Sequence, residues 1–157
     1  MSNNVSTLLK QLSSVSQDLN EASNQLSEQI KGIETALASQ KLGVRAWVEM
    51  RRAPEREKAS DGKIYEFTCV DELGYDKHQG KWGLLVASYY EETLDPSDFE
   101  NAQLLRDAPR ELRMAAVDAL PKLIQKIADE ASKLAKEVAS KAEQAKSIAA
   151  VLNRKQH

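Results

Sequence analysis

The sequence predicts an α+β fold in which long helices at the two ends form an antiparallel coiled-coil or helical-bundle stalk around a small three-stranded antiparallel sheet. Two observations carry this prediction: an apolar heptad stripe near each terminus, and alternating apolar and polar residues between the stripes. We place the first helix at 1–42, the sheet domain with an acidic loop at 43–108, and the last helix at 109–157.

Apolar residues recur every three or four positions near the N-terminus, which is the spacing that places them on one helix face. This first stripe consists of Val5, Leu8, Leu12, Val15, Leu19, Ala22, Leu26, Gln29, Ile33 and Ala36. The remaining positions are mostly Ser, Asn and Gln, which are weak helix formers. We therefore expect this helix to depend on a partner helix. Gly43 is expected to end it.

Three strands are expected in the middle of the chain, where apolar and polar residues alternate or aromatic and β-branched residues gather. They cover about 44–51, 64–76 and 81–90. The polar segment 52–63 is expected to be a loop that ends in an Asp-Gly turn, and 76–80 a hairpin turn. Consecutive strands joined by such turns pair antiparallel.

The segment 91–109 is acidic and contains two prolines, so it is expected to be irregular. A short helix capped by Ser97 or Asp98 is expected within it, ending at Leu105. Pro109 is a suitable first residue for the helix that follows.

The second stripe lies near the C-terminus. It consists of Val117, Leu120, Ile124, Ile127, Ala131, Leu134, Val138, Lys141, Ala145, Ile148 and Leu152. Pro121 falls inside it and predicts a kink or a fresh helix start near 117–121, capped by Asp118. Gln29 and Lys141 interrupt the stripes, either as locally solvated positions or as devices that fix the helix register.

Alanines widen the second stripe beyond what a two-stranded coiled coil can cover, so we expect a homodimer with a four-helix core. Residues 1–40 carry two basic and four acidic side chains, whereas 110–157 carry ten and six, and these opposite signs favour pairing of the ends. The packing residues predicted for the helices and the dimer are Leu12, Leu19, Leu26, Ile124, Ile127, Ala128, Leu134, Ala135, Val138, Ala142 and Ile148.

Composition excludes several classes of protein. The chain has 22 Lys and Arg against 24 Asp and Glu, a balance that argues against a nucleic-acid-binding protein. No apolar run is long enough for a membrane span, and no secretory signal is expected at the N-terminus. The single cysteine, Cys69, fits a cytoplasmic location. Neither His78 nor His157 has a Cys or a carboxylate neighbour at the spacing of metal ligands, so a metal site is not expected. No cofactor is expected either.

Carboxylates are the main candidates for chemistry, and they gather around the second and third strands. They are Asp71, Glu72, Asp76, Glu91, Glu92, Asp95 and Asp98. Paired strands would bring them together as an acid–base pair or a divalent-ion site, or they would form a solvated acidic rim. The chain has no glycine-rich phosphate loop and no nucleophile elbow, so we do not expect an enzyme.

Aromatic and basic residues form the candidate binding site. They are Arg45, Trp47, Arg51, Arg52, Tyr75, Trp82 and Tyr90. The rings either fill the core between sheet and helices, or they stack on a planar ligand whose anionic group the arginines bind.

The sequence therefore predicts a non-enzymatic homodimeric interaction module that binds an unidentified partner through its sheet domain. The alternative is a sensor or sequestering protein for a small anionic ligand such as a nucleotide. An accessory protein of a phage or mobile element would fit the same description.

Overall fold

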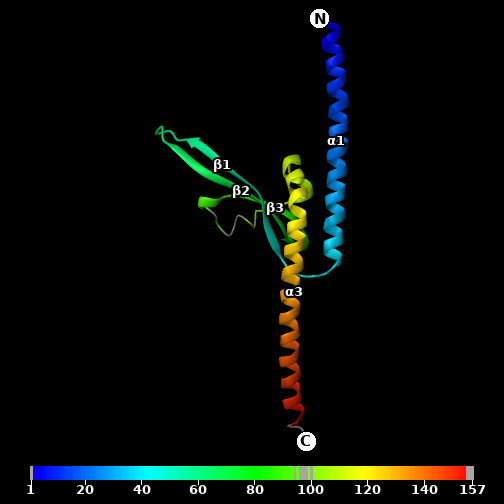
Figure 1. The fold of residues 1–157 in the computed structure, drawn as a ribbon, viewed down its shortest axis with the longest axis vertical. Coiled ribbons are helices and arrows are strands. Elements are labelled where there is room, and N and C mark those ends of the chain that lie inside the picture. The colour runs from blue at the N-terminus through cyan, green and yellow to red at the C-terminus, as the bar shows by residue number, and fades with distance from the viewer. Residues whose placement is uncertain (1, 94, 96–98, 100, 155–157) are drawn as a thin grey trace.

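The computed structural model describes residues 2–93, 95, 99 and 101–154. Two long helices, α1 (Ser2–Ser39) and α3 (Arg110–Arg154), pack on one face of a four-stranded antiparallel sheet (Figure 1). The α+β class is confirmed. Among the described residues, no helix combines the length and the apolar character that crossing a bilayer requires.

The sheet has the strand order β1-β2-β3-β4, so the prediction of three strands is wrong. The strands are β1 (Ala46–Lys58), β2 (Ile64–His78), β3 (Lys81–Tyr90) and β4 (Gln103–Leu104). β4 pairs with β3 opposite Leu85 and Val86. A strand of two residues is too short to produce a periodic pattern, which is why sequence analysis missed it.

Within the short helix predicted to end at Leu105, Phe99 is helical, and the proposed caps, Ser97 and Asp98, lie outside the described residues. The helix does not reach Leu105, because the chain forms β4 and then a 3-10 turn, η2 (Leu105–Asp107), there. A second 3-10 turn, η1 (Glu91–Thr93), directly follows β3.

β1 and β2 continue far beyond the core as a two-stranded ribbon (Figure 1). Their pairing runs from Ala46 opposite Tyr75 to Lys58 opposite Ile64. Most of the loop predicted at 52–63 is therefore strand. Both faces of this ribbon are exposed, so selection for alternating apolar residues is absent and the segment looks like a polar loop. The predicted Asp-Gly turn is confirmed, with Gly62 at φ +79°.

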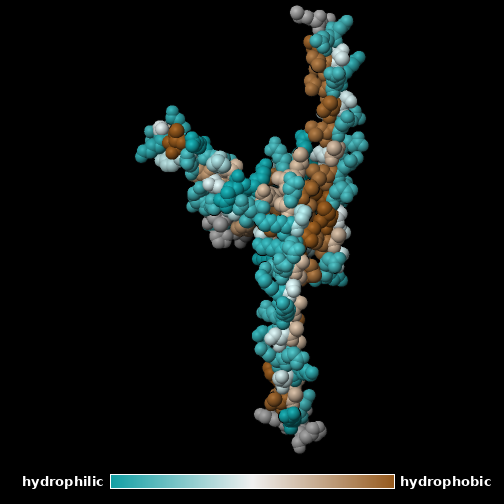
Figure 2. Space-filling model, viewed as in Figure 1, coloured by the Kyte–Doolittle hydropathy of each residue, from teal (hydrophilic) through white to brown (hydrophobic). Residues whose placement is uncertain are grey.

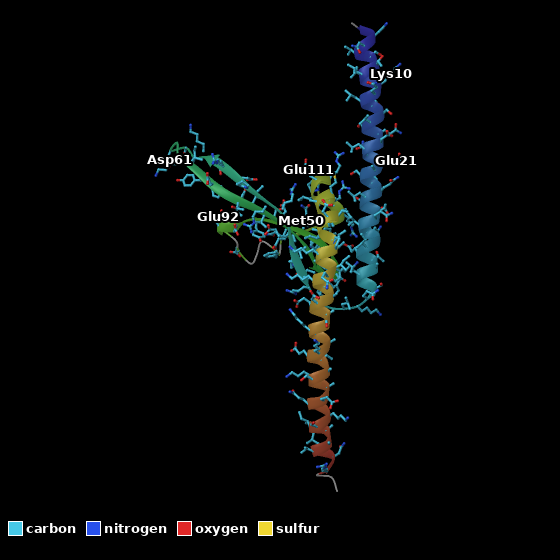
Figure 3. The ribbon with its side chains drawn as sticks, in the orientation of Figure 1. Lys10, Glu21, Met50, Asp61, Glu92 and Glu111 are labelled. Atoms are coloured by element: carbon cyan, nitrogen blue, oxygen red, sulfur yellow. The ribbon has the colours of Figure 1, made fainter. Side chains whose placement is uncertain are left out.

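The predicted antiparallel stalk is wrong, because α1 and α3 run in the same direction and overlap along only part of their lengths (Figure 1). Figure 3 shows Glu21 of α1 at about the level of Glu111, in the first turn of α3, with Lys10 well beyond that level. The chain between the two helices returns to the level of Glu21, where α3 begins. From there α3 runs parallel to α1 rather than antiparallel to it. Heptad spacing identifies a buried face but carries no information on helix direction.

The main core lies between the sheet and the overlapping parts of the two helices. It comprises Ile30, Val44, Ala46, Val48, Leu73, Tyr75, Leu84, Val86, Leu105, Ala108, Leu112, Ala116, Leu120, Leu123 and Ile127. Full burial of each large apolar side chain contributes about 1.5–3 kcal/mol before conformational entropy is subtracted. A smaller cluster on the opposite face of the sheet joins Leu85, Ala87 and Ala102 to Trp47 and Phe99.

Two details of the helices differ from prediction. α1 ends at Ser39 rather than at Gly43, and Lys41 takes the left-handed conformation just beyond it, with φ 51°. α3 runs without interruption through Pro121, so no fresh helix starts there. Leu120 and Leu123 beside the proline are buried against the sheet, and this packing offsets the lost backbone hydrogen bond.

Candidate functional site

Each helix extends beyond the core as a bare arm, and the two arms point in opposite directions (Figure 1). We call residues 3–22 the α1 arm and residues 128–154 the α3 arm. The first stripe continues along the α1 arm, where six large apolar side chains are between 47% and 64% exposed. They are Val5, Leu8, Leu9, Leu12, Val15 and Leu19.

The α3 arm has the same character. Its large exposed apolar side chains are Leu134, Val138, Ile148, Val151 and Leu152. Between the arms, Met114, Val117 and Ile124 of α3 are also exposed, so the apolar surface continues past the core. Figure 2 shows this apolar surface along α1 and between α1 and α3. Contiguous exposed apolar surface of this extent is typical of an interaction site.

The predicted packing residues divide sharply between core and solvent. Ile127 is buried, and Leu26 packs partly buried against the core. The other nine are exposed, namely Leu12, Leu19, Ile124, Ala128, Leu134, Ala135, Val138, Ala142 and Ile148. Exposed apolar residues at stripe positions contribute no tertiary packing in the single chain, and a helix without such packing is only marginally stable in water.

The predicted aromatic and basic site is split between the two faces of the sheet. Trp47 lies on the face away from the helices, where its ring meets Phe99 edge-on at 5.0 Å between centroids. Its indole N–H donates to Asp76 at 3.2 Å, and Arg45 forms an ion pair with the same carboxylate at 3.5 Å. Trp82 belongs to the opposite face and packs against the main core.

Tyr75 and Trp82 stack on each other, with ring centroids 5.3 Å apart. Tyr75 is buried in the main core, and burial raises the pKa of its hydroxyl. Lys77 lies over the Trp82 ring at 5.7 Å. The rings on this side therefore act as core, as the first of the two sequence interpretations expected.

Arg51 and Arg52 each bind carboxylates within the chain. Arg51 donates to the buried Asp71 from Nε at 2.9 Å, and Ser88 donates to the other oxygen of the same carboxylate. Arg52 binds Glu49 at 3.1 Å and also pairs with Glu91. The hydrogen bond from Arg52 lowers the pKa of Glu49, and Glu49 in turn raises the pKa of Arg52. Both guanidinium groups are thus neutralised without a ligand.

The carboxylates of Asp71, Glu72 and Glu92 do not come together as an acid–base pair. Asp71 faces the helices, whereas Glu72 faces the opposite side, where burial raises its pKa. Glu92 accepts the backbone N–H of Thr68 at 3.0 Å, which lowers its pKa. Among the described residues, no group of three His, Cys, Asp or Glu side chains is suited to a metal ion. Asp98 lies outside these residues.

The ribbon carries an aromatic and acidic face. Tyr90 packs on Phe67 at 5.7 Å between centroids and donates to Glu55 at 3.4 Å. The charge of Glu55 raises the pKa of Tyr90. Tyr65 and Glu57 are cross-strand neighbours two residues further along the ribbon, on the same face, and both are exposed. This surface offers π-faces and negative charge together, a combination suited to cationic side chains.

Sequence analysis missed a hollow of about 350 Å³ at the β2–β3 turn. It is lined by Glu34, His78, Gln79, Lys81, Trp82, Leu104 and Arg106. Glu34 accepts the backbone N–H of Leu84 at 2.9 Å and pairs with Arg106 at 3.1 Å. No local pattern could have indicated this pairing, because Glu34 and Arg106 look like ordinary surface charges in the sequence.

Sequence analysis also missed Arg113, which fastens the first turn of α3 to α1. Its guanidinium donates to the carbonyl oxygen of Ser23 and the hydroxyl of Ser27, both at 2.7 Å, and to the Ser23 hydroxyl at 2.6 Å. Its Nε donates to the carbonyl oxygen of Ala108 at 3.0 Å. These bonds fix the relative height of the two helices and so determine how far each arm projects.

Comparison with known proteins adds no relative: no family model, no curated protein and no solved structure matches the chain.

Proposed function

We propose that the protein is a non-enzymatic interaction module that associates with itself through its helical arms and offers its sheet to a further partner. The observation that carries this proposal is the row of exposed Val, Leu and Ile side chains on both arms. Such rows at heptad spacing are stable when another helix covers them.

The magnitude of the apolar effect supports association. Full burial of a Val, Leu or Ile side chain contributes about 1.5–3 kcal/mol, and the α1 arm has six such side chains that are roughly half exposed. Covering them would contribute on the order of 5–9 kcal/mol for each arm. Two equivalent arms would then offset the 4–15 kcal/mol or more that association costs in lost freedom.

Self-association is tested by sedimentation equilibrium at micromolar concentration. The informative variant is Leu12→Glu, which places a charge in the centre of the α1 stripe, where the single chain exposes 64% of the residue. We expect the wild type to be dimeric and Leu12→Glu to shift strongly toward monomer. Gln17→Glu is the matched control, since it adds the same charge on the opposite side of the helix. A monomeric wild type would refute the proposal.

The ribbon is the part of the sheet that we propose for partner binding. Its exposed tyrosines, Tyr65 and Tyr90, lie beside Glu55 and Glu57, and this chemistry suits a partner segment rich in Lys or Arg. A poly-lysine peptide serves as the probe in fluorescence titration. We expect binding that weakens at least tenfold in Tyr65→Ser with Tyr90→Ser. Replacement of Ser147 by Ala on the α3 arm should leave it unchanged, and equal binding by all three proteins would exclude the ribbon.

A small anionic ligand remains the second candidate, and the hollow beside Trp82 is the place that favours it. Lys81, His78 and Arg106 line this hollow next to an aromatic ring. A thermal-shift panel of nucleotides tests this reading, because a ligand that binds only the folded state raises the Tm. A rise in Tm with the wild type that Lys81→Ala abolishes would support it, and an unchanged Tm across the panel would dismiss it.

A further inference from the structure

We infer that two copies of the chain exchange arms, so that the α1 arm of each copy pairs antiparallel with the α3 arm of the other. This inference rests on the proposed self-association and specifies its geometry. It follows from where the arms project, how long they are and which charges they carry.

The arms project from opposite ends of the core, and both helices run in the same direction (Figure 1). A two-fold axis perpendicular to the helices, placed at the middle of their overlap, reverses the second copy. The α3 arm of the second copy then lies beside the α1 arm of the first and runs antiparallel to it. The same operation pairs the other two arms, so the assembly closes at two copies.

The arms match in length. At 1.5 Å per residue, the α1 arm of residues 3–22 is about 30 Å long and the α3 arm of residues 128–154 is about 40 Å long. Each arm therefore has a partner that covers most of its stripe.

The axis would pass through an apolar surface. Met114, Val117 and Ile124 are exposed in the first part of α3, where the two helices overlap. In the exchanged dimer these residues face the same region of the second copy, which joins the two arm pairs through a central four-helix contact.

Charge favours unlike arms over like arms. The α1 arm carries one basic residue, Lys10, against two acidic residues, Asp18 and Glu21, whereas the α3 arm carries five basic and four acidic residues. Exchange also places the positive end of the α1 dipole beside the negative end of the α3 dipole. Pairing of α1 with α1 in parallel would instead bring two positive helix ends together.

Spin-label distances in the full-length chain test the exchange without depending on the exact register. Cys69→Ser removes the native thiol, and Lys10→Cys carries the label on the exposed face of α1. About 20 residues separate Lys10 from the middle of the overlap, so the two labels of an exchanged dimer should be roughly 60 Å apart. Parallel pairing of α1 with α1 would place them within about 20 Å.

A mixed sample provides the complementary distance. One copy carries Lys10→Cys and the other carries Lys136→Cys, which lies in the part of the α3 arm expected beside Lys10. Arm exchange predicts a distance within about 25 Å for this pair. A dimer with a short Lys10–Lys10 distance would overturn the exchange but leave self-association standing, whereas a monomer would overturn both.

Discussion

Gly74 lies directly against the indole ring of Trp47, its cross-strand partner. A Cβ atom at this position would overlap the six-membered ring of the tryptophan. The ring is held from its other sides by Phe99 and by the hydrogen bond to Asp76, so it cannot move away freely. The Trp47 ring on β1 therefore leaves room only for glycine at position 74 of β2. This contact holds the Trp47 ring in place on the sheet face that points away from the helices.

We expect Gly74→Ala to destabilise the fold by roughly 1–3 kcal/mol, which is the range for overpacking a filled site. Urea unfolding followed by tryptophan fluorescence measures the loss. Gly32→Ala on α1 is the matched control, because nothing lies within 4 Å of its Cβ position and alanine favours the helix by roughly 0.5–1 kcal/mol. Equal effects of the two substitutions would contradict the described packing of Trp47.

Arg113 should be the main polar link between the helices. Arg113→Ala removes a charged donor from the oxygens of Ser23, Ser27 and Ala108, and hydrogen bonds of this kind contribute roughly 1.5–3 kcal/mol. We expect hydrogen exchange to accelerate in α1 around Ser23 and Ser27 more than in the sheet. Arg110→Ala, one turn earlier on the exposed side of α3, should leave that exchange unchanged.

Leu123 is completely buried and contacts the main core, so Leu123→Ala should cost about 2–5 kcal/mol. Chemical denaturation at one fixed chain concentration measures this loss. Ile64→Ala provides the contrast, since Ile64 is 65% exposed at the tip of the ribbon, and its effect should stay within about 0.5 kcal/mol. A large loss with Ile64→Ala would mean that another surface covers the ribbon.

The elements of the fold were readable from the sequence where burial imposes a pattern. β3 was predicted with its observed bounds, because buried apolar residues and flanking turn residues define it. Residues 52–58 of β1, in the distal ribbon, were not predicted as strand, since both faces of this segment meet solvent and nothing selects for alternation.

The packing of the helices was not readable, and Leu12 and Ile127 show why. Both occupy stripe positions, yet Leu12 is largely exposed in the single chain and Ile127 is buried. A heptad stripe indicates that a face is covered by something, and it does not distinguish the chain's own sheet from another molecule. The contacts of Arg113 and the pairing of Glu34 with Arg106 join residues more than 70 positions apart, so local sequence could not predict them.

The residues of the predicted aromatic and basic site do not share one surface in the fold. Arg51 and Trp47 both belong to β1, but the register shift between Glu49 and Arg51 places their side chains on opposite faces of the sheet. Arg51 binds Asp71 on the face that the helices cover. Such a bulge inserts a residue and so reverses the faces beyond it. Alternation read from the sequence alone therefore grouped residues that the fold separates.

Stability should depend on pH through Glu72. Burial is the main cause of its raised pKa, which lies above the usual 4.5, so the folded protein binds the proton more tightly than the unfolded chain does. In that case stability falls as the pH rises from the unfolded pKa through the folded pKa, and then levels off. Glu49 and Glu92 act in the opposite direction, because their lowered pKa values add stability as the pH rises. Comparison with Glu72→Gln isolates the contribution of Glu72, since glutamine keeps the size and the amide oxygen of the side chain but does not ionise. We expect the unfolding free energy of the wild type, minus that of Glu72→Gln, to decrease between pH 4 and pH 7 in urea titrations. An increase over this range would show that the Glu72 carboxylate is stabilised by its surroundings rather than destabilised by burial.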